Sequence, residues 1–347
     1  VELDFQSDSL PPLQIELQDV SSSSSAPHTL GDFTLPAFQT AIVTPKLGPK
    51  LNQEVQLIPV QHPRPGEVVV KIAYTGICGS DVVFSLGPED GLRGPNHIAG
   101  HEGIGHIVMS HDKSLLGKPV AARYLASYCR SCHYCIRGVP ESCHKQTTFP
   151  RHHNGTFQQY MTAPYTSLMP LPDFIFDETA GVIGIDLPWK VEALGSRAAD
   201  VFDEFIAAPF NASERIKVME RIADACARLR PVGEARRGAD SVLVTSGDES
   251  AFEGLIDYVC DGGSVICVGV TKSRGNLTIP LALMVERSIK LQGLLMGGWD
   301  ESYKVMEYIR DGKVKPIVTE VCLEDTPSRM AAFGNHLNTG KVVVRVD

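Results

Sequence analysis

Three short apolar runs in the second half of the chain, each with Gly within or beside it, are typical of strands. They span residues 239–246, 264–270 and 289–294. Short apolar runs of this kind predict buried parallel strands. Residues 250–260, between the first two runs, predict a helical stretch.

A longer periodic segment, residues 205–230, precedes these strands. Its charged residues occupy the positions between members of an apolar stripe at helical spacing. The stripe consists of Ile216, Met219, Ile222, Cys226 and Leu229. This pattern predicts an amphipathic helix, capped by Asn211 or Ser213, whose apolar face packs against the sheet.

Composition and charge narrow the function classes. A chain of 347 residues with 43% hydrophobic residues can form two domains with sizeable cores. The net charge of −9 argues against nucleic acid and anionic membranes as partners. No stretch has the length of a transmembrane helix, and no apolar signal segment is found. We therefore expect a cytoplasmic protein that acts on a small molecule.

Four cysteines follow the spacing Cys-x2-Cys-x2-Cys-x7-Cys at Cys129, Cys132, Cys135 and Cys143. Thiolates this close in sequence can converge on one tetrahedral zinc ion. Closed four-thiolate coordination leaves no position for a substrate, so we expect a structural zinc site. The alternative is a pair of disulfides. The other five cysteines show no pairing pattern, which favours a reduced compartment and zinc.

Two motifs precede this four-cysteine lobe. They are Gly76-Ile77-Cys78-Gly79-Ser80-Asp81 and Gly100-His101-Glu102-Gly103-Ile104-Gly105-His106. With residues 66–71 before them and the lobe after them, they resemble the zinc-containing alcohol dehydrogenases of the medium-chain dehydrogenase/reductase family. The resemblance covers roughly residues 36–185 and continues more weakly to Asp347.

The resemblance implies an α/β fold with two domains. A GroES-like β-barrel domain is expected over residues 36–170, completed by residues 313–347. A truncated Rossmann-like parallel sheet is expected over residues 171–312, with a zinc ion in the cleft between the two domains. Residues 1–35 are expected to form an N-terminal extension. A homodimer is compatible with the resemblance.

The resemblance also implies a second, catalytic zinc, which makes two zinc ions per chain. In the family, the positions matching Cys78 and His101 bind this zinc. The position matching Ser80 passes a proton to or from the substrate oxygen, and the position matching Asp81 orients the histidine. Glu102 matches a carboxylate that can approach the metal. A thiolate, an imidazole and a carboxylate would leave zinc partly open to a substrate oxygen. The alternative is a buried cysteine and a core histidine.

The next ligand departs from the family pattern. Where many members carry a ligating Cys or Glu, this chain has Ile185 and Asp186. Asp186 is therefore our candidate ligand. The alternative is a helix cap or a solvated loop, because Pro188 suits an early helical position. A carboxylate in place of a thiolate would make the zinc a harder and more electrophilic centre.

The loop that binds the cofactor phosphates in this family has no counterpart in the sequence. Such a loop has the pattern G-x-G-x-x-G between a strand and a helix. The single G-x-G pair among the 31 glycines is Gly103 with Gly105, inside a zinc motif. A block of about 40 to 50 residues, more than one βαβ unit, is therefore expected to be missing after Trp189. This makes NAD(P) binding doubtful.

Three functions of different classes follow from these patterns. The favoured one is a zinc enzyme that has lost NAD(P) binding and performs non-redox chemistry on a small oxygenated substrate, as a lyase, hydrolase, isomerase or cyclase. The alternatives are an NAD(P)-dependent alcohol dehydrogenase or carbonyl reductase with an atypical cofactor site, and a non-catalytic binding relative. His152 or His153 is a further candidate for proton transfer, with a solvated loop as the alternative.

Overall fold

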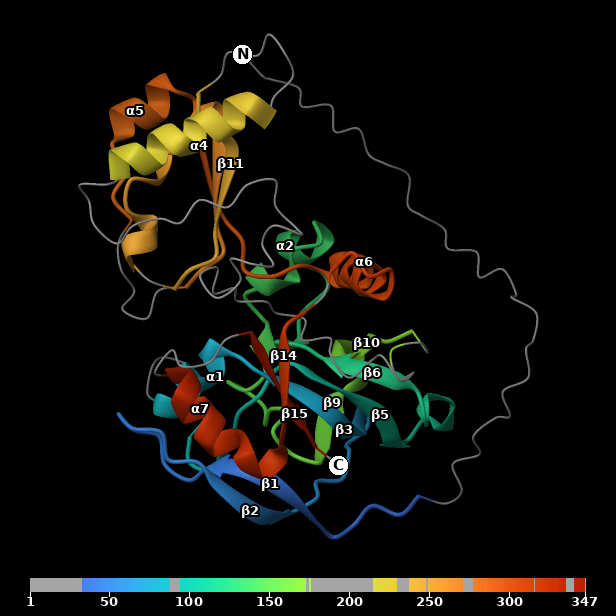
Figure 1. The fold of residues 1–347 in the computed structure, drawn as a ribbon. Helices are drawn as coiled ribbons and strands as arrows, with labels where there is room; N and C mark the ends of the chain where they lie inside the picture. The colour runs from blue at the N-terminus through green and yellow to red at the C-terminus, as the bar shows by residue number, and fades with distance from the viewer. Residues whose placement is uncertain are drawn as a thin grey trace. The chain divides into compact units, whose positions relative to one another are not determined.

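The largest of the described sheets has seven strands with the order β10-β6-β5-β3-β15-β14, in which β9 also pairs with β3 (Figure 1). Its strands are β3 (Glu67–Ile77), β5 (Gly103–Ser110), β6 (Pro119–Ala122), β9 (Tyr160–Pro164), β10 (Met169–Pro170), β14 (Val318–Cys322) and β15 (Lys341–Arg345). A second sheet, β2-β1-β4, consists of β1 (Phe38–Thr44), β2 (Glu54–Pro59) and β4 (His97–Ile98). A small pair is formed by β7 (Leu125–Ser127) and β8 (Thr147–Thr148).

The structure is a computed structural model. It describes residues 33–87, 94–172, 175, 215–229, 237–247, 249–270, 277–314, 316–334 and 340–346. All of these residues belong to the unit Phe33–Asp347. Within them, no helix is long and apolar enough to span a bilayer.

Strand β3 is central because both of its faces are apolar. Val68 and Val70 belong to the main core, which also contains Ile42 and Phe157. Val69 points to the opposite face and belongs to a smaller core. Each of these β-branched residues favours an extended backbone. A strand with one solvated face would alternate apolar and polar residues, whereas these valines form a continuous apolar run. The strand therefore holds its end, where the first metal motif begins, in a fixed place.

Helix α1 (Gly79–Leu86) follows β3 directly and contacts α7 (Thr326–Gly334). Helix α2 (His133–Ile136) lies in the four-cysteine lobe. Helix α6 (Trp299–Arg310) packs through Met306 against a cluster on the seven-stranded sheet. The other members of that cluster are Ile104, Ala121, Met169, Leu171 and Ile175.

The last strand of the chain joins the sheet formed by the first half. Strand β15 pairs antiparallel with β3 and parallel with β14. This pairing is the one required if residues 313–347 complete the first domain. The domain boundaries themselves stay a prediction.

A three-stranded parallel sheet is formed by β11 (Ala239–Val244), β12 (Val259–Cys267) and β13 (Lys290–Gly293), in that order. The prediction of three parallel strands is confirmed. The prediction that all three are buried is wrong, because every residue of β13 is exposed. Within the described residues β13 is an edge strand, so it lacks a neighbour on one side. A short helix, α5 (Leu281–Glu286), precedes it.

The helix predicted over residues 250–260 is also wrong. The chain forms two short 3-10 turns, Glu249–Phe252 and Leu255–Asp257, and β12 begins at Val259. Gly254 lies between the turns with φ of +60°, a left-handed conformation that ends a helix. Leu255 and Ile256 are buried in the core of the parallel sheet, and the chain does not continue as one helix here.

Helix α4 (Arg215–Leu229) confirms the later part of the predicted amphipathic segment, and it lies against β11. The remaining predicted positions, including the caps Asn211 and Ser213, lie outside the described residues. The predicted stripe is partly wrong, because Ile216 and Leu229 are 67% and 60% exposed. The buried side chains are Val218, Ala223 and Ala225. The small side chains of Ala223 and Ala225 let the helix approach the sheet. The buried face of the helix is therefore displaced from the predicted stripe of bulkier residues.

Candidate functional site

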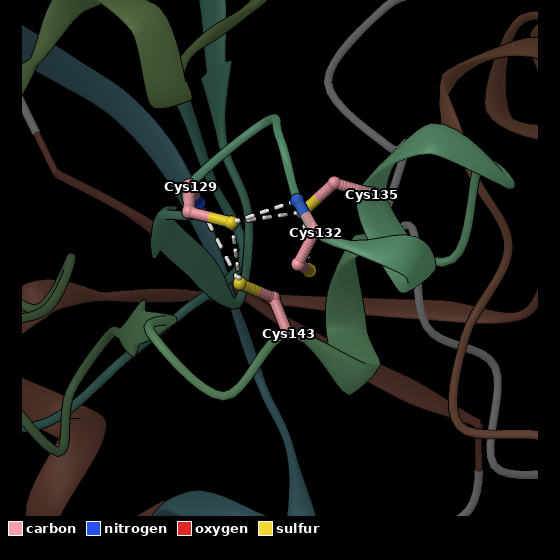
Figure 2. Close-up of side chains that lie close together, drawn as sticks. All are labelled: Cys129, Cys132, Cys135 and Cys143. Carbon is pink, nitrogen blue, oxygen red and sulfur yellow. Dashed lines mark hydrogen bonds between the residues drawn. The ribbon is translucent and has the colours of Figure 1, made fainter.

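The four cysteines of the lobe converge on one point (Figure 2). The sulfur of Cys135 lies 3.8 Å from that of Cys129 and 3.5 Å from that of Cys132. The sulfurs of Cys129 and Cys143 are 3.5 Å apart. Four thiolates at about 2.3 Å from a tetrahedral zinc ion lie about 3.8 Å from one another, whereas disulfide sulfurs are about 2.05 Å apart. The arrangement therefore fits a four-thiolate zinc site.

Backbone N–H groups of the lobe point at two of its sulfurs. The Cys132 N–H donates to the Cys129 sulfur at 3.3 Å, and the Lys145 N–H donates to the Cys143 sulfur at 3.4 Å. Hydrogen bonds from the Ser131 and Cys132 backbone lower the pKa of Cys129 to about 5. Desolvation and the neighbouring thiols raise the pKa of Cys135 to about 12. A divalent cation would resolve this conflict by stabilising all four thiolates.

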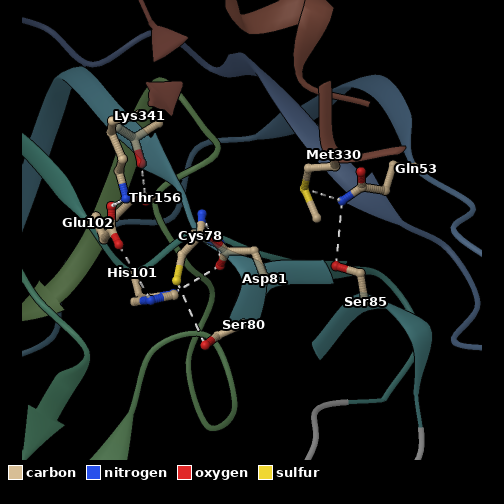
Figure 3. Close-up of polar contacts among 12 residues, drawn as sticks. Gln53, Cys78, Ser80, Asp81, Ser85, His101, Glu102, Thr156, Met330 and Lys341 are labelled. Atoms are coloured by element: carbon tan, nitrogen blue, oxygen red, sulfur yellow. Dashed lines mark hydrogen bonds and ion pairs between the residues drawn. The ribbon is translucent and has the colours of Figure 1, made fainter. Parts of the chain in front are cut away.

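A buried carboxylate holds the two upstream motifs together (Figure 3). Asp81 is fully buried, and its Oδ1 lies 2.9 Å from His101 Nδ1 and accepts the Gly100 N–H at 2.9 Å. Its Oδ2 accepts the N–H of Cys78 at 3.0 Å. Gly100 adopts φ of +97°, which few other residues tolerate, and this turn presents His101 to Asp81. With Nδ1 bound to Asp81, Nε2 is the nitrogen left to bind a metal.

The charge state of His101 depends on this partner. Burial disfavours its charged form, but the charges and hydrogen bonds of Asp81 and Cys78 together outweigh burial and raise the pKa of His101 well above its usual value. The imidazole can bind a metal only after Nε2 loses its proton. Metal binding at this site therefore competes with protonation and weakens as the pH falls.

Glu102 and Ser80 lie beside this pair, as expected. One ligand atom each from Cys78, His101 and Glu102 can be chosen so that all lie within 4.8 Å of one another. The Ser80 hydroxyl lies 3.8 Å from the Cys78 sulfur. A thiolate, an imidazole and a carboxylate form a donor set that suits zinc.

Two aromatic residues that the sequence analysis did not select contact the same imidazole. The ring centroids of Phe84 and Tyr124 lie 6.2 Å and 5.8 Å from that of His101. Phe84 is four positions after Ser80 on α1, so helical spacing could have identified it. Tyr124 carries no comparable local signal, because only the folded sheet brings it near.

The remaining candidates stay predictions. Asp186 lies outside the described residues. His152 and His153 line a cavity of about 490 Å³ that Cys78, His101 and Glu102 do not line. Their ring nitrogens contact Thr148 and Thr147, respectively.

Comparisons with known proteins agree with this geometry. Residues 64–173 match the alcohol dehydrogenase GroES-like domain. Alcohol dehydrogenase 2 of Caenorhabditis elegans is 25% identical over 347 aligned positions, which include 89% of this chain and 97% of the relative. The acetophenone reductase of Geotrichum candidum, in complex with NAD, has a TM-score of 0.66 at 21% identity and covers 90% of this chain and 98% of its own. A thermostable alcohol dehydrogenase of Pyrobaculum aerophilum, with cobalt and zinc bound, has a TM-score of 0.66 at 17% identity, with coverage of 89% and 99%.

The prediction of a missing block after Trp189 stays a prediction. The parallel sheet has three strands within the part of the chain that the structure describes.

The fold class is confirmed as α/β, with a GroES-like β-barrel domain and a Rossmann-like parallel sheet. Similarity to a curated alcohol dehydrogenase extends over nearly its whole length, and the motifs expected from that family lie together in space. Residues 64–173 match the alcohol dehydrogenase GroES-like domain, and the whole chain is similar to the alcohol dehydrogenases of the medium-chain dehydrogenase/reductase family.

Proposed function

We propose that this protein is a zinc-dependent oxidoreductase that interconverts a small alcohol and its carbonyl compound, with NAD(P) as the hydride carrier. The observation that carries this proposal is the buried constellation of Cys78, His101 and Glu102 around one point, with Asp81 behind the imidazole. Near full-length similarity to alcohol dehydrogenases supports redox chemistry. This similarity supports redox chemistry more strongly than it supports the non-redox function that the sequence analysis favoured.

The two donor sets have different roles in this proposal. The four-cysteine lobe would hold a structural zinc, and Cys78 with His101 would hold the catalytic one. Glu102 lies within reach of that metal, and Asp186 is the proposed further ligand. A zinc ion at the Cys78 site would supply a Lewis acid that polarises the substrate oxygen.

The chain's own residues prepare this site for the reaction. Asp81 fixes the tautomer and direction of His101. Cys78 is the N-cap of α1, and its N–H donates to Asp81 Oδ2 at 3.0 Å, which holds the residue in place. Ser80 is the residue proposed to move a proton to or from the substrate oxygen. Phe84 and Tyr124 shield the imidazole from water.

The parallel sheet offers a partial fit for NAD(P). The backbone after β11 and the backbone after β12 approach so closely that a Cβ at Gly269 would lie 1.9 Å from the Ser246 carbonyl oxygen. In sheets of this type, ligands bind outside the carboxyl ends of the strands. The nicotinamide half would therefore lie at Ser246 and Gly269, and NAD(P) would supply or accept the hydride there. A glycine-rich phosphate loop is not found among the residues that the structure describes.

A second candidate function is favoured by the missing block. Without a phosphate-binding loop, a dinucleotide loses its main anchor on a chain with a net charge of −9. The same metal site would then serve a lyase, hydrolase, isomerase or cyclase. Turnover that needs no added nucleotide would favour this candidate.

Replacement of Ser80 by Ala tests the proposed chemistry. We expect kcat to fall about 10²- to 10⁴-fold, because the proton of the substrate oxygen loses its positioned carrier. Zinc content should not change. The wild type should change nicotinamide absorbance in step with product, and Ser80→Thr, which keeps a hydroxyl, should retain most activity. Undiminished turnover by Ser80→Ala would contradict the role of this hydroxyl, and product formed without an absorbance change would contradict the redox reaction.

A further inference from the structure

A buried lysine lies beside the proposed metal site. Lys341, the first residue of β15, forms an ion pair with Glu102, and each side chain is 4% exposed. Glu102 Oε2 faces Lys341, whereas Oε1 lies 3.9 Å from His101 Nε2 (Figure 3). One carboxylate therefore faces a cation on one side and the proposed metal ligands on the other.

Sheet register brings Lys341 to this place. Val342 on β15 pairs with Ile77, the last residue of β3. Because the strands are antiparallel, Lys341 stands opposite Cys78, the residue that follows β3. The Lys341 N–H also donates to the Ile317 carbonyl at 2.8 Å. The end of the chain thus delivers a fixed positive charge to the metal site.

Gly76 provides the space that the ion pair occupies. A Cβ at this position would lie 2.2 Å from Glu102 Oε2 and 2.7 Å from Lys341 Cε. The Gly76 N–H donates to the backbone carbonyl of Glu102 at 2.9 Å, which holds the two strands in register. The pair therefore packs against bare backbone, and the carboxylate has no room to move farther toward β3. Its other oxygen, Oε1, faces His101 Nε2.

The electrostatics of this arrangement set a competition. In a desolvated site, charges a few ångströms apart interact strongly. The Lys341 ammonium attracts the Glu102 carboxylate away from the metal ligands, and it repels a divalent cation. Removal of the lysine charge would leave the metal ion as a stronger attraction for the same carboxylate.

We propose that Lys341 is a positioning residue, which competes with zinc for Glu102 and thereby keeps one coordination position open to substrate. This inference rests on the catalytic metal site proposed above. It requires that Glu102 stays off the metal while Lys341 is present and becomes a ligand when the lysine charge is removed.

Lys341→Met, which keeps an unbranched side chain one atom shorter and removes its charge, tests the proposal. We expect the apparent affinity of the catalytic site for zinc, measured by competition with a chromogenic chelator, to rise about tenfold or more, because a repelling positive charge is removed and a carboxylate is released to the metal. In cobalt-substituted protein, the visible bands of this site should shift as a carboxylate joins the coordination sphere. Subtraction of the cobalt spectrum of Cys78→Ser isolates this site from the four-cysteine lobe. Unchanged or weaker binding in folded Lys341→Met would overturn the proposal.

Two further variants separate positioning from a structural role. The double variant Lys341→Met with Glu102→Gln should return both zinc affinity and the cobalt spectrum toward those of the wild type, because the competing carboxylate is gone. A double variant that behaves like Lys341→Met would overturn the proposal. Glu102→Gln alone should keep the wild-type cobalt spectrum, and a shifted spectrum there would show that Glu102 is already a ligand. If Lys341→Met does not fold, the cobalt spectrum of Glu102→Gln alone still tests the proposal. A wild type with metal in the lobe alone would instead refute the proposed catalytic site.

Discussion

Replacing Cys132 by Ser is expected to unfold the protein or make it aggregate. The four cysteine sulfurs lie 3.5 to 3.8 Å apart where the structure pairs them, so they act as one site. A structural zinc of this kind contributes about 10 kcal/mol or more to folding, whereas a domain has about 5 to 15 kcal/mol of total stability. Loss of one zinc ligand therefore removes most of the free energy that keeps the domain folded. Thermal unfolding and zinc content of the purified variant measure this effect.

Cys322→Ser is the matched control for this prediction. Cys322 is an exposed free cysteine at the end of β14, so the same chemical change there should leave the unfolding temperature and zinc content at wild-type values. A Cys132→Ser protein with the unfolding temperature of this control would show that the lobe does not depend on metal.

The second large effect is expected at Cys78. Cys78→Ser should lower kcat/KM about 10³-fold or more, because the Lewis acid supplies several kcal/mol of transition-state stabilisation and each 1.36 kcal/mol is about tenfold in rate. The fold should persist, since the strand and helix that flank Cys78 are held by packing and hydrogen bonds. Zinc content should fall from two ions to one per chain.

Val83→Ala on the same helix is the control for Cys78. Val83 is 45% exposed, and its truncation should leave activity and both zinc ions unchanged. Steady-state kinetics, zinc analysis and circular dichroism of the two variants complete the comparison. A Cys78→Ser protein that keeps two zinc ions and wild-type activity would remove Cys78 from the site.

The parts of the site that could be predicted from sequence are those encoded locally. The cysteines of the lobe are close in sequence, so their spacing alone predicts convergence. Cys78 and His101 meet only because β3 and β5 pair, with Thr75 opposite Gly103. The family resemblance predicted that Cys78 and His101 lie together, whereas their spacing in the sequence did not. Lys341 was missed because it arrives on the last strand of the chain, and no local pattern links it to Glu102.

The errors in the fold have a related cause. Gly254 and the burial of Leu255 and Ile256 decided the conformation between β11 and β12, and these depend on the sheet that packs there. Ile216 at the start of α4 belongs to the predicted apolar stripe, yet it is 67% exposed. Periodicity predicts that an element exists, whereas tertiary packing selects its buried face.

Titration of the zinc-loaded wild-type protein with NAD and with NADP in a calorimeter tests whether this protein is an NAD(P)-dependent oxidoreductase. We expect one of the two nucleotides to bind with a sub-millimolar Kd and a ratio of one per chain. Cys78→Ser should bind it as well, because its nicotinamide half-site, at Ser246 and Gly269, does not include the metal ligands. Zinc-loaded protein that binds neither nucleotide would contradict the redox function and leave the same metal site to non-redox chemistry.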